Sequence, residues 1–291
     1  MEFYVSQIIN GIATGSVYGL FGLSIMFIYR STRVINLAQG AMATATTILT
    51  FTLLKTMPAW LAVLSGLSFA FFLGVFLETT IMKLLKERSE LNSTVVMIGL
   101  FAIINSVDQW IFGTEAQPFP SPISDEIIKW HDFAISNQSI WIMGCALVMS
   151  LLLYALFKFT SIGIAFQAMS EDEMATRLKG VRVGPLISIG WGISSIFGAI
   201  AAMLIAHTLF LSADLMSTPL LYGFVAAIVG GLQTSFGAIF GGIVIGIIEN
   251  LAGTWAPVGS SLKIVVVCLV MIVFLVIKPR GIFGRDEPRK M

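Results

Sequence analysis

The sequence predicts an all-α protein: a polytopic transmembrane helical bundle of eight or nine membrane segments. Three observations predict this fold class. Hydrophobic residues make up 57% of the 291 residues and charged residues only 11%, whereas soluble domains are about 25% charged. The mean hydropathy is +0.92, and long apolar runs recur along the whole chain. Because no polar stretch is long enough for a second domain, residues 1–291 are expected to form a single transmembrane domain.

The apolar runs give the membrane segments in order, since a spanning helix needs roughly 17–25 mostly apolar residues. The first run has no basic residue before Arg30, unlike a cleaved signal peptide, and is expected to remain as a span. The run 219–253 is too long for one span, and we divide it near Gln233, among glycines and polar residues. This gives nine segments, or eight if one part re-enters the membrane or the run is a single tilted helix. The predicted segments are 7–29, 34–54, 59–80, 91–112, 139–157, 186–207, two within 219–253, and 261–277.

Basic residues set the orientation, because lysine and arginine gather in cytoplasmic loops. With the N-terminus outside, 14 of the 17 lysines and arginines lie in inner connections or the tail. The other three, Lys55, Lys129 and Lys263, lie outside. The opposite orientation inverts this ratio, so we predict an outer N-terminus and a cytoplasmic C-terminus. The largest outer connection, about 113–138, contains three prolines and is expected to be a loop. It is either simply solvated or a contact surface for an extracytoplasmic partner.

Several kinds of site are not expected on this chain. The net charge of +1 gives no indication of nucleic-acid binding. Cys145 and Cys268 lie in apolar runs and are too few for a zinc site, so we predict no metal and no disulfide. The sequence has no H-E-x-x-H or G-x-S-x-G motif and no phosphate-binding loop, so neither an intramembrane enzyme nor bound ATP is expected. No charged residue lies near the middle of a span, which disfavours an ion-driven carrier.

One inner loop, about 158–185, is rich in charge for this chain, with six charged side chains between Ser170 and Arg182. Ser170 and Glu173 have the spacing of a capping box, and Gly180 suits a left-handed helix stop. A helix over about 171–179 is therefore predicted, roughly 13 Å long and too short to be stable alone in water, so its apolar stripe has to pack on something. An ordinary inner loop also accounts for these residues. The residues expected to contact a partner are Ser170, Glu171, Asp172, Met174, Ala175, Arg177, Leu178 and Gly180.

Polar residues within the spans have two interpretations that stay open. Asn36 and Gln39 are three residues apart and share a helix face, and Asn10 and Thr14 are four apart. Such side chains either line a translocation path or hydrogen-bond to a neighbouring helix.

Glycines recur at a spacing of four residues in the first segment and late in the chain. Small residues at this spacing let helix backbones approach closely, and smooth faces can also slide between two packed states. The residues expected to pack in this way are Gly11, Gly15, Gly19, Gly237, Gly241, Gly242 and Gly246.

Five stretches, in order along nearly the whole chain, resemble the branched-chain amino acid ABC transporter permease family (LivH type). Gln39 stands where members of this family usually have His. The first two stretches contain Ile9, Asn10, Gly11, Gly15, Ser16, Val17 and Tyr18, then Val34, Ile35, Asn36, Ala38 and Gly40. The inner loop contributes Gly163, Ala168, Glu171, Ala175, Arg177, Leu178, Gly180 and Val181. The last two contain Gly230, Gly231, Leu232, Gly237, Gly241, Gly242, Gly246, Glu249 and Asn250, then Lys278, Pro279, Arg280, Gly281, Ile282, Phe283 and Gly284.

The resemblance implies a permease subunit of an importer in a bacterial or archaeal cytoplasmic (inner) membrane. It implies a second, related permease as a heterodimer partner, two ABC ATPase subunits that bind ATP and Mg²⁺, and an extracytoplasmic solute-binding protein. The short inner helix would be the coupling helix that enters a cleft of the ATPase. The implied substrates are branched-chain or other hydrophobic amino acids, with urea or short amides as the alternative. An ATP-independent channel or uniporter, or a structural membrane subunit, are further hypotheses.

Overall fold

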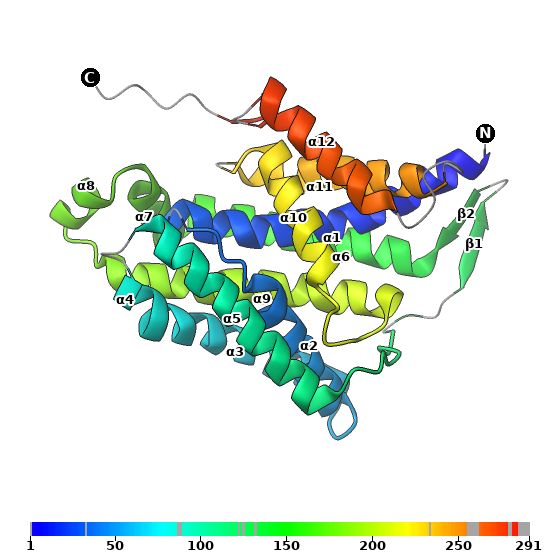
Figure 1. Ribbon diagram of the computed structural model, residues 1–291, viewed down its shortest axis with the longest axis horizontal. Helices are drawn as coiled ribbons and strands as arrows, with labels where there is room; N and C mark the ends of the chain where they lie inside the picture. Colours follow the sequence, from blue (N-terminus) through cyan, green and yellow to red (C-terminus); the bar gives the residue numbers. More distant parts are fainter. Residues whose placement is uncertain are drawn as a thin grey trace. The chain divides into compact units, whose positions relative to one another are not determined.

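The structure is a computed structural model in which nearly all regular elements are helices (Figure 1). It describes residues 2–32, 34–85, 89–121, 123, 126–130, 133–232, 234–254, 262–278 and 281–284. The helices are α1 Glu2–Thr32, α2 Gln39–Leu54, α3 Ala59–Leu77, α4 Lys83–Leu85, α5 Glu90–Phe112, α6 Asn137–Phe159, α7 Ser161–Glu171, α8 Glu173–Leu178, α9 Val183–Leu209, α10 Ser217–Gly230, α11 Ser235–Thr254 and α12 Lys263–Ile277. A single π-helical turn, η1 Glu78–Met82, joins α3 to α4.

The described residues contain six helices that are long and apolar enough to cross a membrane. The prediction of an all-α, multi-pass membrane protein is therefore confirmed. Three further helices are shorter, with 16 residues in α2, 14 in α10 and 15 in α12. The predicted break in the run 219–253 is also confirmed, since α10 ends at Gly230 and α11 begins at Ser235, although Gln233 itself lies outside the described residues.

Two boundaries were predicted wrongly. Residues 34–38 are not helical, and α2 begins only at Gln39. The connection 113–138 is not only a loop, because β1 Ile127–Trp130 pairs antiparallel with β2 Phe133–Ser136. The strands have only four residues each, too few for a clear strand pattern in the sequence, and the prolines that precede them predict a loop.

The chain divides into two compact units. Unit 1 comprises Met1–Met26, Ile123–Ala146 and Leu221–Met291, and unit 2 comprises Phe27–Pro122 and Leu147–Leu220. A single domain over the whole chain stays a prediction.

Unit 1 is built on close packing between the first part of α1 and α11, with α12 lying beside α11 (Figure 1). The segment after α12 folds back on the end of α10. The backbone N–H groups of Ile282 and Phe283 donate to the carbonyl oxygens of Val229 (2.8 Å) and Gly230 (3.2 Å). These carbonyls belong to the last turn of α10, where carbonyl groups have no hydrogen-bond partner within the helix. The chain turn at Gly281, with φ of +80°, makes this return possible.

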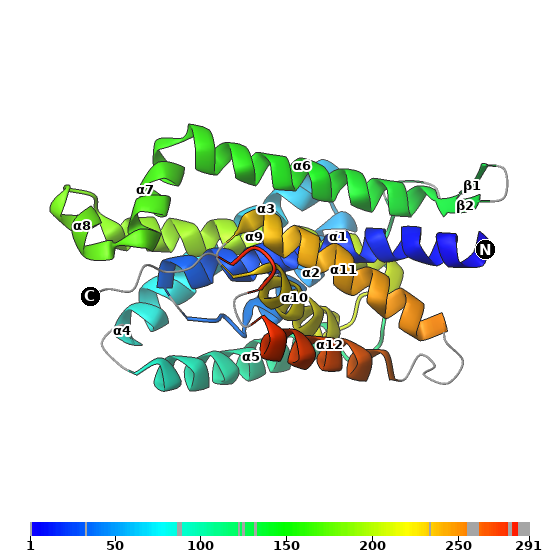
Figure 2. The same ribbon diagram turned by 90° about the horizontal axis from the view of Figure 1, so that it is seen from above.

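Unit 2 has α2 at its centre, where it contacts α3, α5 and α9. Four buried threonines of α2 point into this core, and three of them, Thr46, Thr47 and Thr50, donate their hydroxyls to the carbonyl four residues earlier. Such bonds satisfy a hydroxyl that would otherwise be unpaired in an apolar interior. Figures 1 and 2 both place α4, α7 and α8 at one end of this unit.

Candidate functional site

The predicted inner loop forms a helical hairpin of α7 and α8. Thr160 begins α7, since its hydroxyl accepts a hydrogen bond from the N–H of Gly163 (3.0 Å). Phe166 and Met169 anchor α7 in unit 2, with exposed fractions of 1% and 4%. Phe166 packs against Phe27, with ring centroids 4.4 Å apart. The hairpin is therefore tied to the body of unit 2 through α7.

The start of α8 differs from the prediction, and the capping box of Ser170 and Glu173 is wrong. Asp172 has an extended backbone and ends α7, and its carboxylate accepts the N–H of Ala175 at 3.0 Å. An aspartate in this position caps a helix as well as a serine does, and α8 therefore begins later than expected. Ser170 lies in the last turn of α7 and accepts a hydrogen bond from Arg30 (3.3 Å). Glu173 pairs instead with Arg177 at 2.6 Å.

The end of α8 is as predicted. Gly180 has a φ of +84°, in the left-handed region. Its N–H donates to the carbonyl of Arg177 (2.9 Å), and the N–H of Val181 donates to the carbonyl of Thr176 (3.4 Å). This pair of bonds is the Schellman motif, which satisfies the last carbonyls of a helix. Backbone geometry thus fixes both ends of a helix of only six residues.

The outward face of α8 is apolar. Met174 is 66% exposed and Leu178 80% exposed, and Ala175 beside them is also exposed. Thr176 faces the other way and is buried at 3%. Among the described residues, nothing covers the stripe of Met174, Ala175 and Leu178, although α8 is held rigidly at both ends. A small apolar stripe presented in this way suits a contact with another surface.

Glycines bring the backbones of α1 and α11 into contact within unit 1. A Cβ atom on Gly15 would lie 2.6 Å from the carbonyl oxygen of Gly242, and one on Gly11 would lie 2.7 Å from the Cα of Ile247. From the other side, Gly242 and Gly246 face the backbone of α1. Gly19 contacts α11 near Ile239 in the same way, whereas Gly237 and Gly241 pack on α10. The structure thus divides the predicted packing glycines between two helix pairs.

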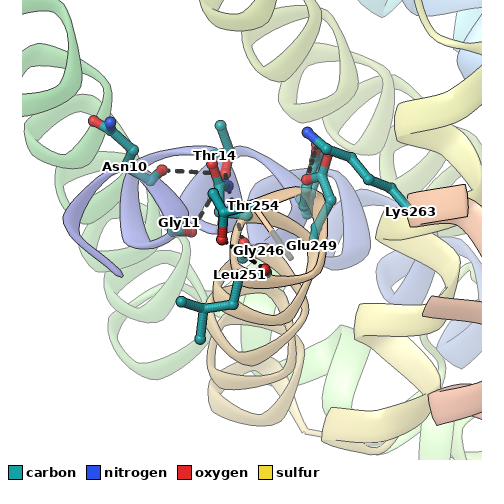
Figure 3. Close-up of polar contacts among 10 residues, drawn as sticks. Asn10, Gly11, Thr14, Gly246, Glu249, Leu251, Thr254 and Lys263 are labelled. Carbon is teal, nitrogen blue, oxygen red and sulfur yellow. Dashed lines mark hydrogen bonds and ion pairs between the residues drawn. The ribbon is translucent and has the colours of Figure 1, made fainter. Parts of the chain in front are cut away.

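Polar side chains follow the same face of α1 (Figure 3). Thr14 donates to the carbonyl of Asn10 (3.2 Å) and accepts a hydrogen bond from the side-chain amide of Asn250 (3.0 Å). The Oδ1 atom of Asn10 accepts a hydrogen bond from Ser139 on α6 (3.3 Å). Asn10 and Thr14 are only half-buried. They form a polar seam where α1 meets α11.

Asn36 and Gln39 lie together in unit 2 and are completely buried. The amide of Asn36 donates to Oε1 of Gln39 (3.0 Å), and Gln39 donates to the carbonyl oxygen of Ser194 on α9 (3.1 Å). This geometry favours the interhelical interpretation, because the two amides join the start of α2 to α9.

Comparison with known proteins gives the family. The sequence profile described as "Branched-chain amino acid transport system / permease component" matches residues 7–275. The chain belongs to this family. It is therefore a permease component of a transport system and not an enzyme in its own right.

Relatives match the permease over nearly its whole length. It is 23% identical to the "High-affinity branched-chain amino acid transport system permease protein LivH" of Escherichia coli strain K12, over 99% of this chain and 98% of that protein. Identity is 24% with BraD of Pseudomonas aeruginosa, over 99% and 98%. It is 25% with a probable LivH of Methanocaldococcus jannaschii, over 92% and 88%. The solved structure of PsaBC from Streptococcus pneumoniae in complex with Fab covers 97% of this chain and 94% of its own, with 14% identity and a TM-score of 0.47, too low for any conclusion.

Sequence reasoning missed one polar cluster in the permease. The hydroxyl of Tyr18 donates to Glu249 (2.8 Å), and Nζ of Lys263 lies 4.0 Å from the other carboxylate oxygen. Figure 3 shows Glu249 and Lys263 facing each other beside the seam. Tyr18 follows Asn10 and Thr14 at a spacing of four residues, and both Tyr18 and Glu249 lie in stretches that resemble the family, but nothing in the sequence pairs the two residues.

The described part of the permease contains no group of three or more His, Cys, Asp or Glu side chains that is able to hold a metal ion. That ATP and Mg²⁺ bind to another subunit stays a prediction.

Proposed function

We propose that this permease is the membrane-spanning subunit of a binding-protein-dependent ABC importer for branched-chain or other hydrophobic amino acids. Two separate ATPase subunits bind ATP and Mg²⁺, and a solute-binding protein delivers the substrate to the outer face. The translocation path lies between this permease and a second, related permease, and it opens to one side of the membrane at a time. The family match over residues 7–275 and the names of LivH and BraD support this proposal.

The proposed topology has nine membrane segments in a bacterial or archaeal cytoplasmic membrane, with the N-terminus outside and the C-terminus inside. The nine helices other than α4, α7 and α8 supply these segments. At 1.5 Å per residue, α2 and α10 are about 24 Å and 21 Å long, shorter than the roughly 30 Å hydrocarbon core. We therefore propose that they cross with the help of the non-helical residues that precede or follow them.

We propose that α8 is the helix through which ATP hydrolysis moves the permease. The observation that supports this role is the exposed stripe of Met174, Ala175 and Leu178 on a helix with fixed ends. Burying a leucine or methionine side chain is worth about 1.5–3 kcal/mol, so burial of this stripe favours docking of α8 in a groove. Because Asp172 joins α8 to α7, and α7 is anchored by Phe166, a force on α8 passes into unit 2.

Leu178→Asp tests this assignment. Leu178 has 80% exposure and contributes little to the fold of the permease, so the variant should insert and remain folded. A charge in the partner's groove is costly to bury, and we expect the ATPase subunits to be lost on purification of the complex. Leu209→Asp, at the end of α9, is the control because Leu209 is also exposed (48%) and lies on the proposed outer side. Normal ATPase retention by Leu178→Asp would exclude α8 as the contact.

Uptake by the reconstituted complex tests the transport function itself. We expect leucine to enter proteoliposomes only with ATP and with the solute-binding protein present. Transport of urea in preference to leucine would support the alternative substrate class. Leucine flux through the permease alone, without ATPase subunits, would show a channel or uniporter instead.

The four polar residues have different proposed roles in transport. Asn10 and Thr14 are half-buried in the seam and are candidates for contact with the substrate. Asn36 and Gln39 are fully buried, and their hydrogen bonds to each other and to α9 support a role in positioning α2 beside the path.

A further inference from the structure

Unit 2 contains a pocket of about 380 Å³ beside the α7–α8 hairpin. Its volume lies within the range of roughly 300–1,000 Å³ that is usual for small-molecule sites. The walls come from the end of α1, the π-turn η1 with α4, and the adjoining ends of α5, α7, α8 and α9, all within unit 2. In the proposed topology every one of these helix ends lies on the cytoplasmic side. The lining residues used below are Arg30, Glu78, Met82, Lys83, Met169 and Ile187.

The π-turn places opposite charges on one wall of the pocket. The backbone N–H of Lys83 donates to the carbonyl of Glu78, five residues earlier. In an α-helix, residues five apart point in directions about 140° apart, whereas the i→i+5 bond of a π-turn reduces this separation. Thr79 and Thr80 in this turn donate their hydroxyls to Val75 and Phe76 (2.8 and 2.5 Å). π-turns of this kind are found frequently at functional sites.

The carboxylate of Glu78 is held in place at the inner part of this wall. Glu78 is 7% exposed and accepts a hydrogen bond from Ser188 on α9. Lys83 is exposed at the rim. Arg30 also lines the pocket, and Ser170 and the ring of Phe157, 5.7 Å from the guanidinium carbon, hold its side chain. The pocket therefore presents a fixed negative charge near positive charges.

Apolar side chains form the remaining surface of the pocket. Met82, Met169 and Ile187 are all buried, with exposed fractions of 7%, 4% and 5%. A ligand that matches all three features carries an ammonium group, a carboxylate and an apolar side chain. Charged groups recognise such a ligand at its two ends, and the methionines adapt to the shape of its side chain.

We propose that this pocket binds a zwitterionic amino acid with an apolar side chain on the cytoplasmic side of the permease. The carboxylate of Glu78 binds the ammonium group, and Lys83 binds the carboxylate. The cytoplasmic location and the identity of the ligand as transported product rest on the proposed function. Because Glu171 and Glu173 of the α7–α8 hairpin also line the pocket, a bound amino acid links the π-turn to the ATPase contact. Amino acid that accumulates inside the cell should then slow ATP hydrolysis.

Binding of L-leucine to the purified, detergent-solubilised permease tests the pocket. The comparison ligands are 4-methylpentanoate, which lacks the ammonium group, and 3-methylbutylamine, which lacks the carboxylate. We expect Glu78→Gln to weaken binding of leucine and of the amine by about tenfold or more, the usual effect of losing a charged hydrogen bond, and to leave binding of the acid unchanged. Lys83→Met should weaken binding of leucine and the acid but not the amine.

Glu115→Gln is the matched control, because Glu115 is an exposed carboxylate of unit 2 outside the pocket. Lys83 is exposed, so Lys83→Met tests the pocket even if Glu78→Gln fails to fold. Leucine binding that neither variant weakens would overturn the proposal.

The reconstituted complex separates this proposal from the proposed function. ATP-driven leucine uptake, together with leucine binding that is unchanged in both variants, would overturn the proposed amino acid site and leave the proposed function intact. Leucine binding that depends on Glu78 and Lys83, in a complex without ATP-driven uptake, would overturn the proposed function alone. With leucine on the ATPase side, hydrolysis by the wild-type complex should fall and hydrolysis by Lys83→Met should fall less. Equal inhibition of both would overturn the regulatory part.

Discussion

At the scale of single residues, glycines decide how closely α1 and α11 approach. Valine at Gly15 would place a Cβ 2.6 Å from the carbonyl oxygen of Gly242 and force the helices apart. Overpacking of this kind costs about 1–3 kcal/mol, so Gly15→Val should lower the thermal stability of the solubilised permease. Gly144→Val is the control, since a Cβ on Gly144 meets nothing within 4 Å. An equal loss of stability in both variants would contradict the packing role.

The pair of Tyr18 and Glu249 is a second residue-scale feature. Tyr18→Phe removes the donor that Glu249 accepts at 2.8 Å, in a site where Tyr18 is only 4% exposed. A buried acceptor that loses its donor costs about 1–3 kcal/mol, and thermal unfolding should show this loss. In the Glu249→Leu background the same change should cost less, because the acceptor is already gone. Strictly additive effects would show that the two side chains do not interact.

These residues also show what sequence reasoning is able to find. The glycine spacing predicts close packing because it repeats within one helix. The bond from Tyr18 to Glu249 joins residues 231 positions apart, and no local pattern connects them. The sequence also leaves two roles open for Gln39, lining a path or bonding to a neighbouring helix. Only its hydrogen bond to Ser194 on α9 favours the second.

At the scale of elements, the segment after α12 completes the turn between α10 and α11. Ile282 and Phe283 supply the backbone donors for Val229 and Gly230, and the Phe283 ring lies 5.4 Å from that of Phe236. A chain ending at Lys278 should therefore show faster hydrogen exchange near residue 231 and a lower melting temperature. A chain ending at Gly284 keeps these contacts and should behave like the full chain. Similar exchange in both truncated chains would contradict the role of this segment.

Helices were predicted better than the details within them. The length of an apolar run is set by the thickness of the membrane. The existence and approximate bounds of the helices can therefore be predicted from hydropathy alone. The cap of α8 was misplaced because Ser170 and Asp172 are both good capping residues, and tertiary contacts with Arg30 decide between them. The π-turn at Glu78 has no sequence signal at all, since it depends on how α3 meets α9.

At the scale of the whole molecule, the orientation in the membrane rests on the distribution of basic residues. Single cysteines test it in a background in which Cys145 and Cys268 are replaced by serine. Leu178→Cys should react with an impermeant maleimide only from the cytoplasmic side, and Glu115→Cys only from the outside, because both residues are exposed. Labelling of Leu178→Cys from outside would reverse the topology and remove α8 from reach of an ATPase.

The class of the whole protein could be predicted from composition, and its family from motifs spread along the chain. The division into two compact units could not, because three of its four boundaries, at 26/27, 146/147 and 220/221, fall inside continuous helices rather than in linkers. The pocket beside α7 was also out of reach, since it needs the ends of six separate segments to meet.

The interlocked backbones of α1 and α11 have a mechanical consequence. Glycine-lined faces are able to slide, but here Gly242 and Gly246 are seated against the backbone of α1. The hydrogen bonds of Asn250 to Thr14 and of Tyr18 to Glu249 fasten the same contact along its length. Sliding by one residue would break these bonds together, so we expect α1 and α11 to move as one rigid body. Whatever bending transport requires must therefore take place at its ends and in its neighbours.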